Sequence, residues 1–329
     1  MLKTLSSLFG ISGFEEDVAD FVVKSAKPFA DRVFKDSFGN VYVYKKGINP
    51  KKTVMLCAHT DEVGLIVSSV TEDGYVKFRT VGGIDSGVLP AKGVYIGENR
   101  IKGVIGYPAA HLSSAESRKK KVPCEELYID IGAADRLEAL SYVRRGDPIY
   151  FEDTFEETES MVFGKAFDDR AGCFVLLTLL KEQYENDLYF VFTAQEETGL
   201  RGAQIASRRI EADEYIVVEN TTCLDMPGVP REKHSTALGG GPALTVTDGA
   251  SFANVILREN LAARAPHFQY KNAAAGGNDA GAISKNGKCV AAVSVPCRYL
   301  HTPVGGISKT VLIETVAMLS AYLKGESLC

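Results

Sequence analysis

The most constraining stretch of the sequence is residues 188–199, in which an apolar run ends in two adjacent carboxylates. The run Leu-Tyr-Phe-Val-Phe-Thr-Ala is rich in aromatic and β-branched residues, and Gly199 closes the segment. Its length and composition predict a buried strand of a parallel sheet. Glu196 and Glu197 then lie just beyond the carboxyl end of that strand, where the loops of open α/β sheets converge on a ligand-binding crevice.

Length, charge and cysteine usage exclude several classes of protein. At 329 residues the chain exceeds the usual size of one domain, which favours a large domain with a smaller inserted one. A net charge of −5 argues against a nucleic-acid or anionic-membrane partner, because the only concentrated basic stretch is residues 118–121. The chain lacks a signal-peptide pattern and a long apolar run, and its seven cysteines show no CxxC spacing. We therefore expect a cytoplasmic protein with reduced thiols.

Strand and helix patterns alternate along most of the chain. Ser12 and Glu15 form the S-x-x-E pattern of a helix capping box, and apolar spacing predicts a helix from there to about residue 28. Further segments are a hairpin over 32–44, strands over 53–58, 215–218, 243–246 and 290–295, and helices over 171–180, 251–263 and 308–323. This alternation predicts an α/β fold with a mixed central sheet and helices on both faces.

An inserted β domain is predicted for residues 68–163. Short strands punctuated by glycine replace the helical periodicity there, with one helical stretch at 134–143. Such a pattern is typical of a small β-barrel. Residues 1–67 and 164–329 would then form the larger α/β domain.

Imidazole and carboxylate side chains gather at the predicted carboxyl edge of the sheet. They are His59, Asp61, Asp168, Glu196, Glu197, Glu219 and His301. Taken singly, each has an ordinary explanation, such as a satisfied histidine, a solvated turn or a carboxylate that starts a helix. Taken together they indicate a metal site, and imidazole with carboxylate suits zinc, cobalt or manganese. Two histidines and three carboxylates can hold two ions if one carboxylate bridges, which leaves Glu196 as a base.

Five segments resemble, in order and spacing, the dinuclear glutamyl or deblocking aminopeptidases, metallopeptidase family forty-two. They are residues 59–64, 164–170, 196–199, 276–281 and 298–303, so the resemblance covers nearly the whole chain. It implies a zinc-exopeptidase fold and a site in which His59 and Glu219 bind one metal ion, Glu197 and His301 bind the other, and Asp168 bridges them. It also implies that Asp61 orients His59 and that Glu196 activates a metal-bridging water, as residues behind metal ligands commonly support them.

The same resemblance implies an activity and an assembly. The expected activity is removal of N-terminal residues from short peptides, with two divalent ions per subunit, zinc or cobalt. Family members build homododecamers from dimers, so a homo-oligomer is expected. Residues 1–67 and 164–329 would be the catalytic domain, and residues 68–163 would serve assembly and substrate access.

Two departures and two alternatives accompany this interpretation. The family has Asp where Glu219 stands and Thr where Asn278 stands. Paired carboxylates also serve glycoside hydrolases, but adjacent Glu196 and Glu197 cannot face each other across a glycosidic bond. A non-catalytic relative with a decayed metal site is the other alternative. Because no basic residue can be placed in a pocket from the sequence, we expect a broad or neutral N-terminal preference.

Overall fold

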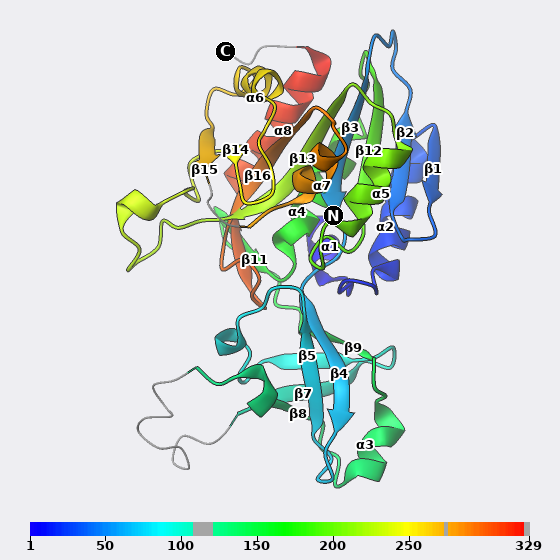
Figure 1. Ribbon diagram of the computed structural model, residues 1–329, viewed down its shortest axis with the longest axis vertical. Coiled ribbons are helices and arrows are strands. Elements are labelled where there is room, and N and C mark those ends of the chain that lie inside the picture. Colours follow the sequence, from blue (N-terminus) through cyan, green and yellow to red (C-terminus); the bar gives the residue numbers. More distant parts are fainter. Residues whose placement is uncertain (108–120, 273–275, 326–329) are drawn as a thin grey trace.

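The protein consists of an α/β lobe joined to a smaller β-barrel lobe (Figure 1). The computed structural model describes residues 1–107, 121–272 and 276–325. Of the basic stretch at 118–121, only Lys121 falls within these ranges, and it pairs with Asp85 at 2.7 Å. None of the helices in the described ranges combines the length and hydropathy needed to cross a membrane.

An 11-stranded mixed sheet forms the centre of the larger lobe, in the order β1-β2-β12-β3-β13-β16-β17-β11-β10, with β14 and β15 attached beside β16. Its strands are β1 (Arg32–Lys35), β2 (Val41–Lys45), β3 (Thr53–His59), β10 (Glu156–Glu157), β11 (Met161–Gly164), β12 (Asp187–Thr193), β13 (Glu214–Thr222), β14 (Ala243–Thr247), β15 (Gln269–Asn272), β16 (Val290–Arg298) and β17 (Gly305–Ser308). The neighbours β12 and β3, β3 and β13, and β13 and β16 run parallel. Their carboxyl ends therefore share one edge of the sheet.

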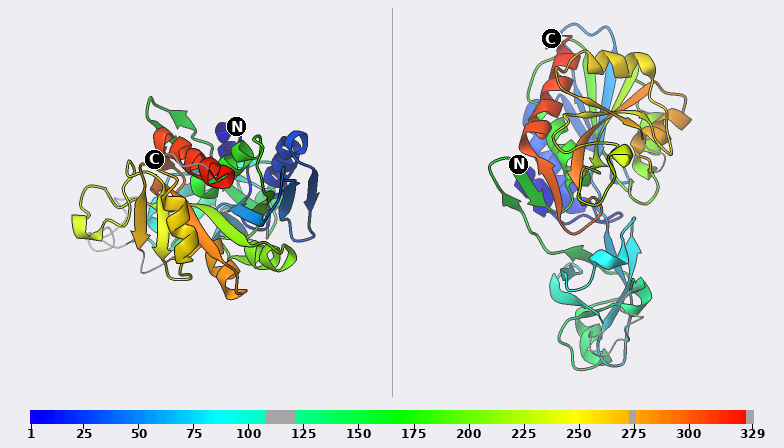
Figure 2. Two further views of the ribbon diagram at one scale, coloured as in Figure 1. Left: turned by 90° about the horizontal axis from the view of Figure 1, so that it is seen from above. Right: turned by 90° about the vertical axis from the view of Figure 1, so that its left-hand side faces the viewer.

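Helices cover both faces of this sheet, as the sequence predicted (Figure 2). They are α1 (Leu2–Ser7), α2 (Glu16–Ala26), α4 (Phe167–Leu179), α5 (Arg201–Arg209), α6 (Val255–Ala262), α7 (Asp279–Lys285) and α8 (Lys309–Lys324). Successive residues of a strand point to opposite faces. In β3, Leu56 joins the core formed with α4 and α8, whereas Cys57 joins the core formed with α5 and α7. Central strands buried on both faces are consistent with their nearly continuous apolar sequences.

The smaller lobe is a closed barrel, as predicted. Its strands follow the order β4-β5-β8-β7-β6-β9 and enclose an apolar core of their own. They are β4 (Gly64–Val70), β5 (Val76–Val81), β6 (Gly93–Ile96), β7 (Ile101–Gly106), β8 (Tyr128–Asp130) and β9 (Pro148–Phe151), with α3 (Arg136–Tyr142) between β8 and β9. The barrel strands run from Gly64 to Phe151, whereas the expected insert was residues 68–163. Residues 156–157 and 161–164 instead form β10 and β11 of the central sheet.

Two local expectations were wrong. The helix α2 begins at Glu16 without a side-chain cap, because Ser12 Oγ donates to Asp61 Oδ2 at 2.6 Å instead of capping the helix. The strand expected over 215–218 is longer, β13 (Glu214–Thr222), so Glu219 lies inside it, three residues before its end. Short 3₁₀ helices complete the fold at Lys27–Phe29, Ser86–Val88, Cys124–Glu126 and Arg231–Lys233.

Candidate metal centre

The carboxyl edge of the parallel strands brings the predicted site residues together. His59 ends β3, Glu196 and Glu197 follow β12, Glu219 lies near the end of β13, and His301 follows β16. Asp168 comes from the first turn of α4, which packs against β3 and β13. Segments far apart in the sequence thus meet because parallel strands end side by side.

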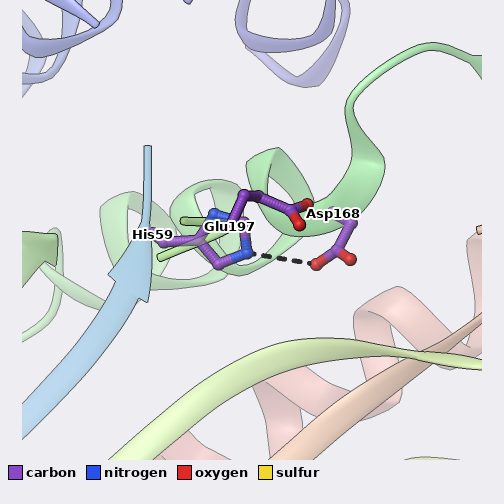
Figure 3. A group of neighbouring side chains, drawn as sticks. All are labelled: His59, Asp168 and Glu197. Atoms are coloured by element: carbon purple, nitrogen blue, oxygen red, sulfur yellow. Dashed lines mark hydrogen bonds and ion pairs between the residues drawn. The ribbon is translucent and has the colours of Figure 1, made fainter. Parts of the chain in front are cut away.

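Asp168 lies between two histidines. Its Oδ1 is 3.2 Å from His59 Nε2, and its Oδ2 is 3.2 Å from His301 Nε2. Figure 3 shows the carboxylate of Asp168 facing the ring of His59, with Glu197 beside them. A carboxylate that offers one oxygen to each of two imidazoles has the arrangement needed to bridge two cations.

Each histidine is oriented by an acceptor on its other ring nitrogen. His59 Nδ1 lies 3.0 Å from the carbonyl oxygen of Asp61, and His301 Nδ1 lies 3.0 Å from the carbonyl oxygen of Gly83. Gly83 belongs to the segment that follows β5, so the barrel lobe contributes one of these acceptors. In both cases the Nε2 atom faces Asp168. An acceptor on the other ring nitrogen fixes the ring in this way in metal-binding imidazoles.

Buried carboxylate oxygens without hydrogen bonds complete the cluster. Among the residues that the structure describes, Glu197 Oε1 accepts no hydrogen bond, although His301 Nε2 is only 3.4 Å away. Glu219 Oε1 likewise has no partner in the described part of the chain, and its Oε2 lies 3.9 Å from His59 Nε2. Buried polar atoms almost always have partners, so these orphaned oxygens are consistent with cation ligands.

Within the described residues, potential ligand atoms form two groups, and in each group all of these atoms lie within 4.8 Å of one another. One consists of His59, Asp168 and Glu197, and the other of His59, Asp169 and Glu219. Asp169 was not expected in the site. Its Oδ2 accepts from the backbone of His59 at 3.1 Å and its Oδ1 from Gly172 at 2.9 Å. Both carboxylate oxygens of Asp169 are therefore occupied by backbone N–H groups. We interpret Asp169 as a residue that holds the backbone of His59 in place and not as a ligand of an ion.

The charges of the cluster also fit bound cations. Burial raises the pKa of Glu197 to about 8, and repulsion from Asp168 acts in the same direction. Burial likewise raises the pKa of Glu196 and of Glu219 well above the ordinary value. Burial alone would lower the pKa of His301, but its hydrogen bond to Asp168 and the negative charges of Glu197 and Asp168 together outweigh this and raise the pKa to about 9. Several acidic groups packed at close range ionise together only when cations compensate their charge.

A cavity of about 960 Å³ opens over the cluster. Its wall includes Asp168, Glu196, Glu197, Glu219 and His301, together with residues that follow β13 and residues around α7. Lys233 and Lys271 also line it. A concave site of this size next to a charged cluster is the expected setting for a small substrate.

Comparison with known proteins identifies the family. A sequence model of the M42 glutamyl aminopeptidases matches residues 39–318. The chain belongs to the M42 glutamyl aminopeptidase family. A putative aminopeptidase of Acetivibrio thermocellus is 34% identical over 97% of this chain and 96% of its own. The lysyl aminopeptidase of Pyrococcus furiosus is 29% identical over 98% of this chain and 96% of its own.

Solved structures of M42-type aminopeptidases share the fold. The TET aminopeptidase of the marine sediment archaeon Thaumarchaeota archaeon SCGC AB-539-E09 has a TM-score of 0.94, at 33% identity over 99% of this chain and 96% of that one. The Pyrococcus horikoshii TET1 peptidase, described as assembling into a tetrahedron or a large octahedral shell, has a TM-score of 0.88. Its identity is 30%, over 98% of both chains. As an M42 protein the chain is a metal-dependent aminopeptidase, and the glycoside hydrolase alternative is not favoured.

Sequence reasoning missed two parts of this M42 site. The cavity lysines Lys233 and Lys271 lie in stretches without a recognisable motif, so nothing in the sequence could place them. Ser12 and Glu15 were noticed, but their S-x-x-E spacing was assigned to a helix cap. In the structure both side chains have long-range partners instead, because Ser12 Oγ donates to Asp61 Oδ2 and Glu15 Oε1 accepts from Gln195 N. No local pattern in the sequence marks such partners.

Proposed function

We propose that the chain removes N-terminal residues from short peptides at a centre of two divalent metal ions, zinc or cobalt. His59 and Glu219 hold one ion, Glu197 and His301 hold the other, and Asp168 bridges them. The observation that carries this proposal is the position of Asp168, with one oxygen 3.2 Å from the Nε2 of each histidine. The unpartnered oxygens of Glu197 and Glu219 supply further negatively charged ligands on either side.

Glu196 is the residue we assign to proton transfer. Divalent ions in such a centre polarise the scissile carbonyl and lower the pKa of a water molecule. Glu196 takes the proton of the attacking water and returns it to the leaving amine. Its carboxylate is about one-tenth exposed, and Oε2 lies 4.0 Å from His59 Nε2. Asp61 acts behind the site, where it faces Nδ1 of His59 and fixes the orientation of that ring.

Lys233 and Lys271 support a preference for an acidic N-terminal side chain. Both line the cavity over the metal centre, and within the described residues neither is placed in an ion pair. The carboxylates of the centre are compensated by its metal ions, so these ammonium groups are available to attract a carboxylate of the substrate. This proposal replaces the broad or neutral preference that we expected from the sequence.

The assembly of related proteins supports a homo-oligomer. TET aminopeptidases with this fold are described as dodecamers, tetrahedra or octahedral shells. We propose that this chain also assembles with copies of itself, with the barrel lobe contributing to assembly and substrate access and the α/β lobe forming the catalytic domain. A cytoplasmic location remains a prediction.

One set of assays tests the proposed activity and its substrate class. The purified protein should contain close to two divalent ions per subunit and should hydrolyse glutamyl-p-nitroanilide faster than leucyl-p-nitroanilide. Chelation should abolish both activities, and zinc or cobalt should restore them. Lys233→Met and Lys271→Met should reduce the preference for glutamate, whereas Lys285→Met, on the exposed end of α7, should leave it unchanged. A metal-free preparation that cleaves cellulose would contradict the proposal.

A further inference from the structure

The turn that carries Glu196 and Glu197 is held by side chains from outside it. Four consecutive backbone N–H groups of this turn each donate to a side-chain oxygen. Ala194 N donates to Asn40 Oδ1 (2.9 Å), Gln195 N to Glu15 Oε1 (3.1 Å), Glu196 N to Asp61 Oδ1 (2.9 Å) and Glu197 N to Asp61 Oδ2 (3.1 Å). We call residues 194–199 the glutamate turn.

The three acceptor residues come from three separate parts of the α/β lobe. Asn40 precedes β2, Glu15 precedes α2, and Asp61 follows β3. Two of them are held in place by the N-terminal segment, because Ser12 Oγ donates to Asp61 Oδ2 at 2.6 Å and Gly13 N donates to Glu15 Oε1 at 2.8 Å. All three acceptors are buried. The turn is therefore fixed by buried side chains from outside it, and one of them, Asp61, also faces the ring of His59.

Asn40 also ties the start of the glutamate turn to α5, the helix that follows it. Its Nδ2 donates to the carbonyl oxygen of Gly202 at 3.2 Å while its Oδ1 accepts from Ala194. A Cβ at Gly202 would lie 2.4 Å from both Asn40 Oδ1 and the carbonyl oxygen of Ala194, so a side chain is excluded there. The close approach of these two backbone segments thus depends on glycine.

The backbone of the turn requires such support. Gln195 has a φ of 57°, in the left-handed region that non-glycine residues rarely adopt. Residues in that region persist when their surroundings hold them, and they concentrate at functional sites. The two bonds to the Asp61 carboxylate are of the stronger kind, because hydrogen bonds from backbone N–H groups to charged acceptors are stronger than those to neutral ones.

We infer that Glu15, Asn40 and Ser12 are positioning residues that hold the carboxylate of Glu196 in its place for proton transfer. This inference rests on the proposed function, in which Glu196 is the base. Proton transfer requires the base within hydrogen-bond reach of the attacking water, and small displacements of a reacting group are costly. Loss of an acceptor behind the turn should therefore lower kcat while KM, which reports on substrate contacts in the cavity, changes little.

Glu15→Ala and Glu15→Gln test the inference as a pair. The alanine variant removes the acceptor of Gln195 N, so kcat should fall about 10–100-fold, as for other residues that support catalytic groups. The glutamine variant keeps an oxygen that can accept from Gln195 N. Its kcat should therefore stay within about threefold of the parent value. Glu16→Ala is the matched control, since Glu16 is exposed and its contact is an ion pair with Lys35. Metal content should be unchanged in all three.

Amide hydrogen exchange provides a readout independent of activity. Exchange of residues 194–197 should accelerate in Glu15→Ala and remain at the parent level in Glu15→Gln. If Glu15→Ala does not fold, Ser12→Ala removes only the hydroxyl that holds Asp61 and should lower kcat by about tenfold. The inference is overturned if both alanine variants keep the parent kcat, or if Glu15→Gln is as impaired as Glu15→Ala.

A comparison with Glu196→Gln separates this inference from the proposed function. If Glu196→Gln keeps its activity, the assignment of the base is wrong, and the positioning inference falls with it. If Glu196→Gln is inactive and both Glu15→Ala and Ser12→Ala keep the parent kcat, only the positioning inference is wrong.

Discussion

At the scale of single residues, two adjacent glutamates have different surroundings. Glu196 Oε2 lies 4.0 Å from His59 Nε2, whereas Glu197 Oε1 lies 3.4 Å from His301 Nε2. Burial raises the pKa of both carboxyl groups. The backbone of both residues is anchored by the two oxygens of Asp61. One short turn can therefore present a ligand to one side of the centre and a base to the other.

Replacing Glu196 tests the assignment of the base. Glu196→Gln keeps the shape of the side chain and removes its ability to accept a proton. We expect turnover to fall by about 10²–10⁴-fold, the usual contribution of general acid–base catalysis. Both metal ions and substrate binding should be retained, which metal analysis and KM measurements can check. Near-normal turnover with full metal content would remove Glu196 from the mechanism, and loss of metal would make it a ligand.

Glu219 tests the assignment of the ligands. It stands inside β13 where aspartate is expected, and its Oε1 has no partner. Glu219→Asp should keep metal occupancy and activity or increase them, because aspartate is the shorter ligand expected at this position. Glu219→Ala should lose one ion, with metal affinity or activity reduced about 10–100-fold or more. Two ions per subunit in the alanine variant, measured by elemental analysis, would show that Glu219 is not a ligand.

At the scale of elements, a buried ion pair locks the N-terminal segment to the sheet edge. Lys165 Nζ lies 2.7 Å from Glu62 Oε1 and donates to the carbonyl oxygen of Leu8 at 2.8 Å. Lys165 connects β11 to α4, and Glu62 connects β3 to β4. Arg170 reinforces the contact by donating to the carbonyl oxygen of Leu5 at 2.6 Å. Three connections around the metal centre are thereby held in one arrangement.

Breaking that pair should destabilise the protein. Lys165→Met leaves the carboxylate of Glu62 buried without its main partner, and unpaired buried charges of this kind cost about 3–5 kcal/mol. The free energy of unfolding, measured by denaturant titration, should fall by that amount. Adding Glu62→Gln should recover part of the loss, because the second substitution removes the unpaired charge. A Lys165→Met variant as stable as the parent would show that the pair does not hold the segment.

At the scale of the whole molecule, the barrel lobe contributes a residue to the proposed metal centre. The carbonyl oxygen of Gly83, just after β5, orients His301. Gly83 also lines the cavity over the metal centre. The position of the barrel therefore affects both one histidine of the proposed centre and the entrance that a substrate uses.

The proposed assembly leads to a prediction of size selection. If copies of the chain enclose the active sites, short peptides should be cleaved and a stably folded protein should not. Light scattering should give a mass well above one subunit of 35.6 kDa, and mass spectrometry should find a folded test protein intact after incubation. The same test protein, once unfolded, serves as the control, because its cleavage shows that the sequence itself can be a substrate. A stable monomer that digests the folded protein would contradict the prediction.

The sequence predicted the fold well where its patterns are periodic. Alternating strand and helix segments led to the mixed α/β sheet covered on both faces, and glycine-punctuated strands led to the inserted barrel. The parallel strands were predicted by their apolar runs, since strands buried on both faces carry apolar side chains at every position. Polar residues at the ends of those runs then marked the edge at which His59, Glu197 and His301 meet.

The tertiary structure alone decided which partners the polar residues have. Ser12 matches a capping box by spacing, yet its hydroxyl bonds to Asp61, because folding places the N-terminal segment behind the metal centre. Lys233 and Lys271 became a feature of the cavity only when segments far apart in the chain came together. The periodicity of apolar residues indicates how much of a helix or strand is buried. This periodicity is a local property, so the sequence itself determines it. The direction and partner of a single hydrogen bond depend on long-range packing, so only the folded structure fixes them.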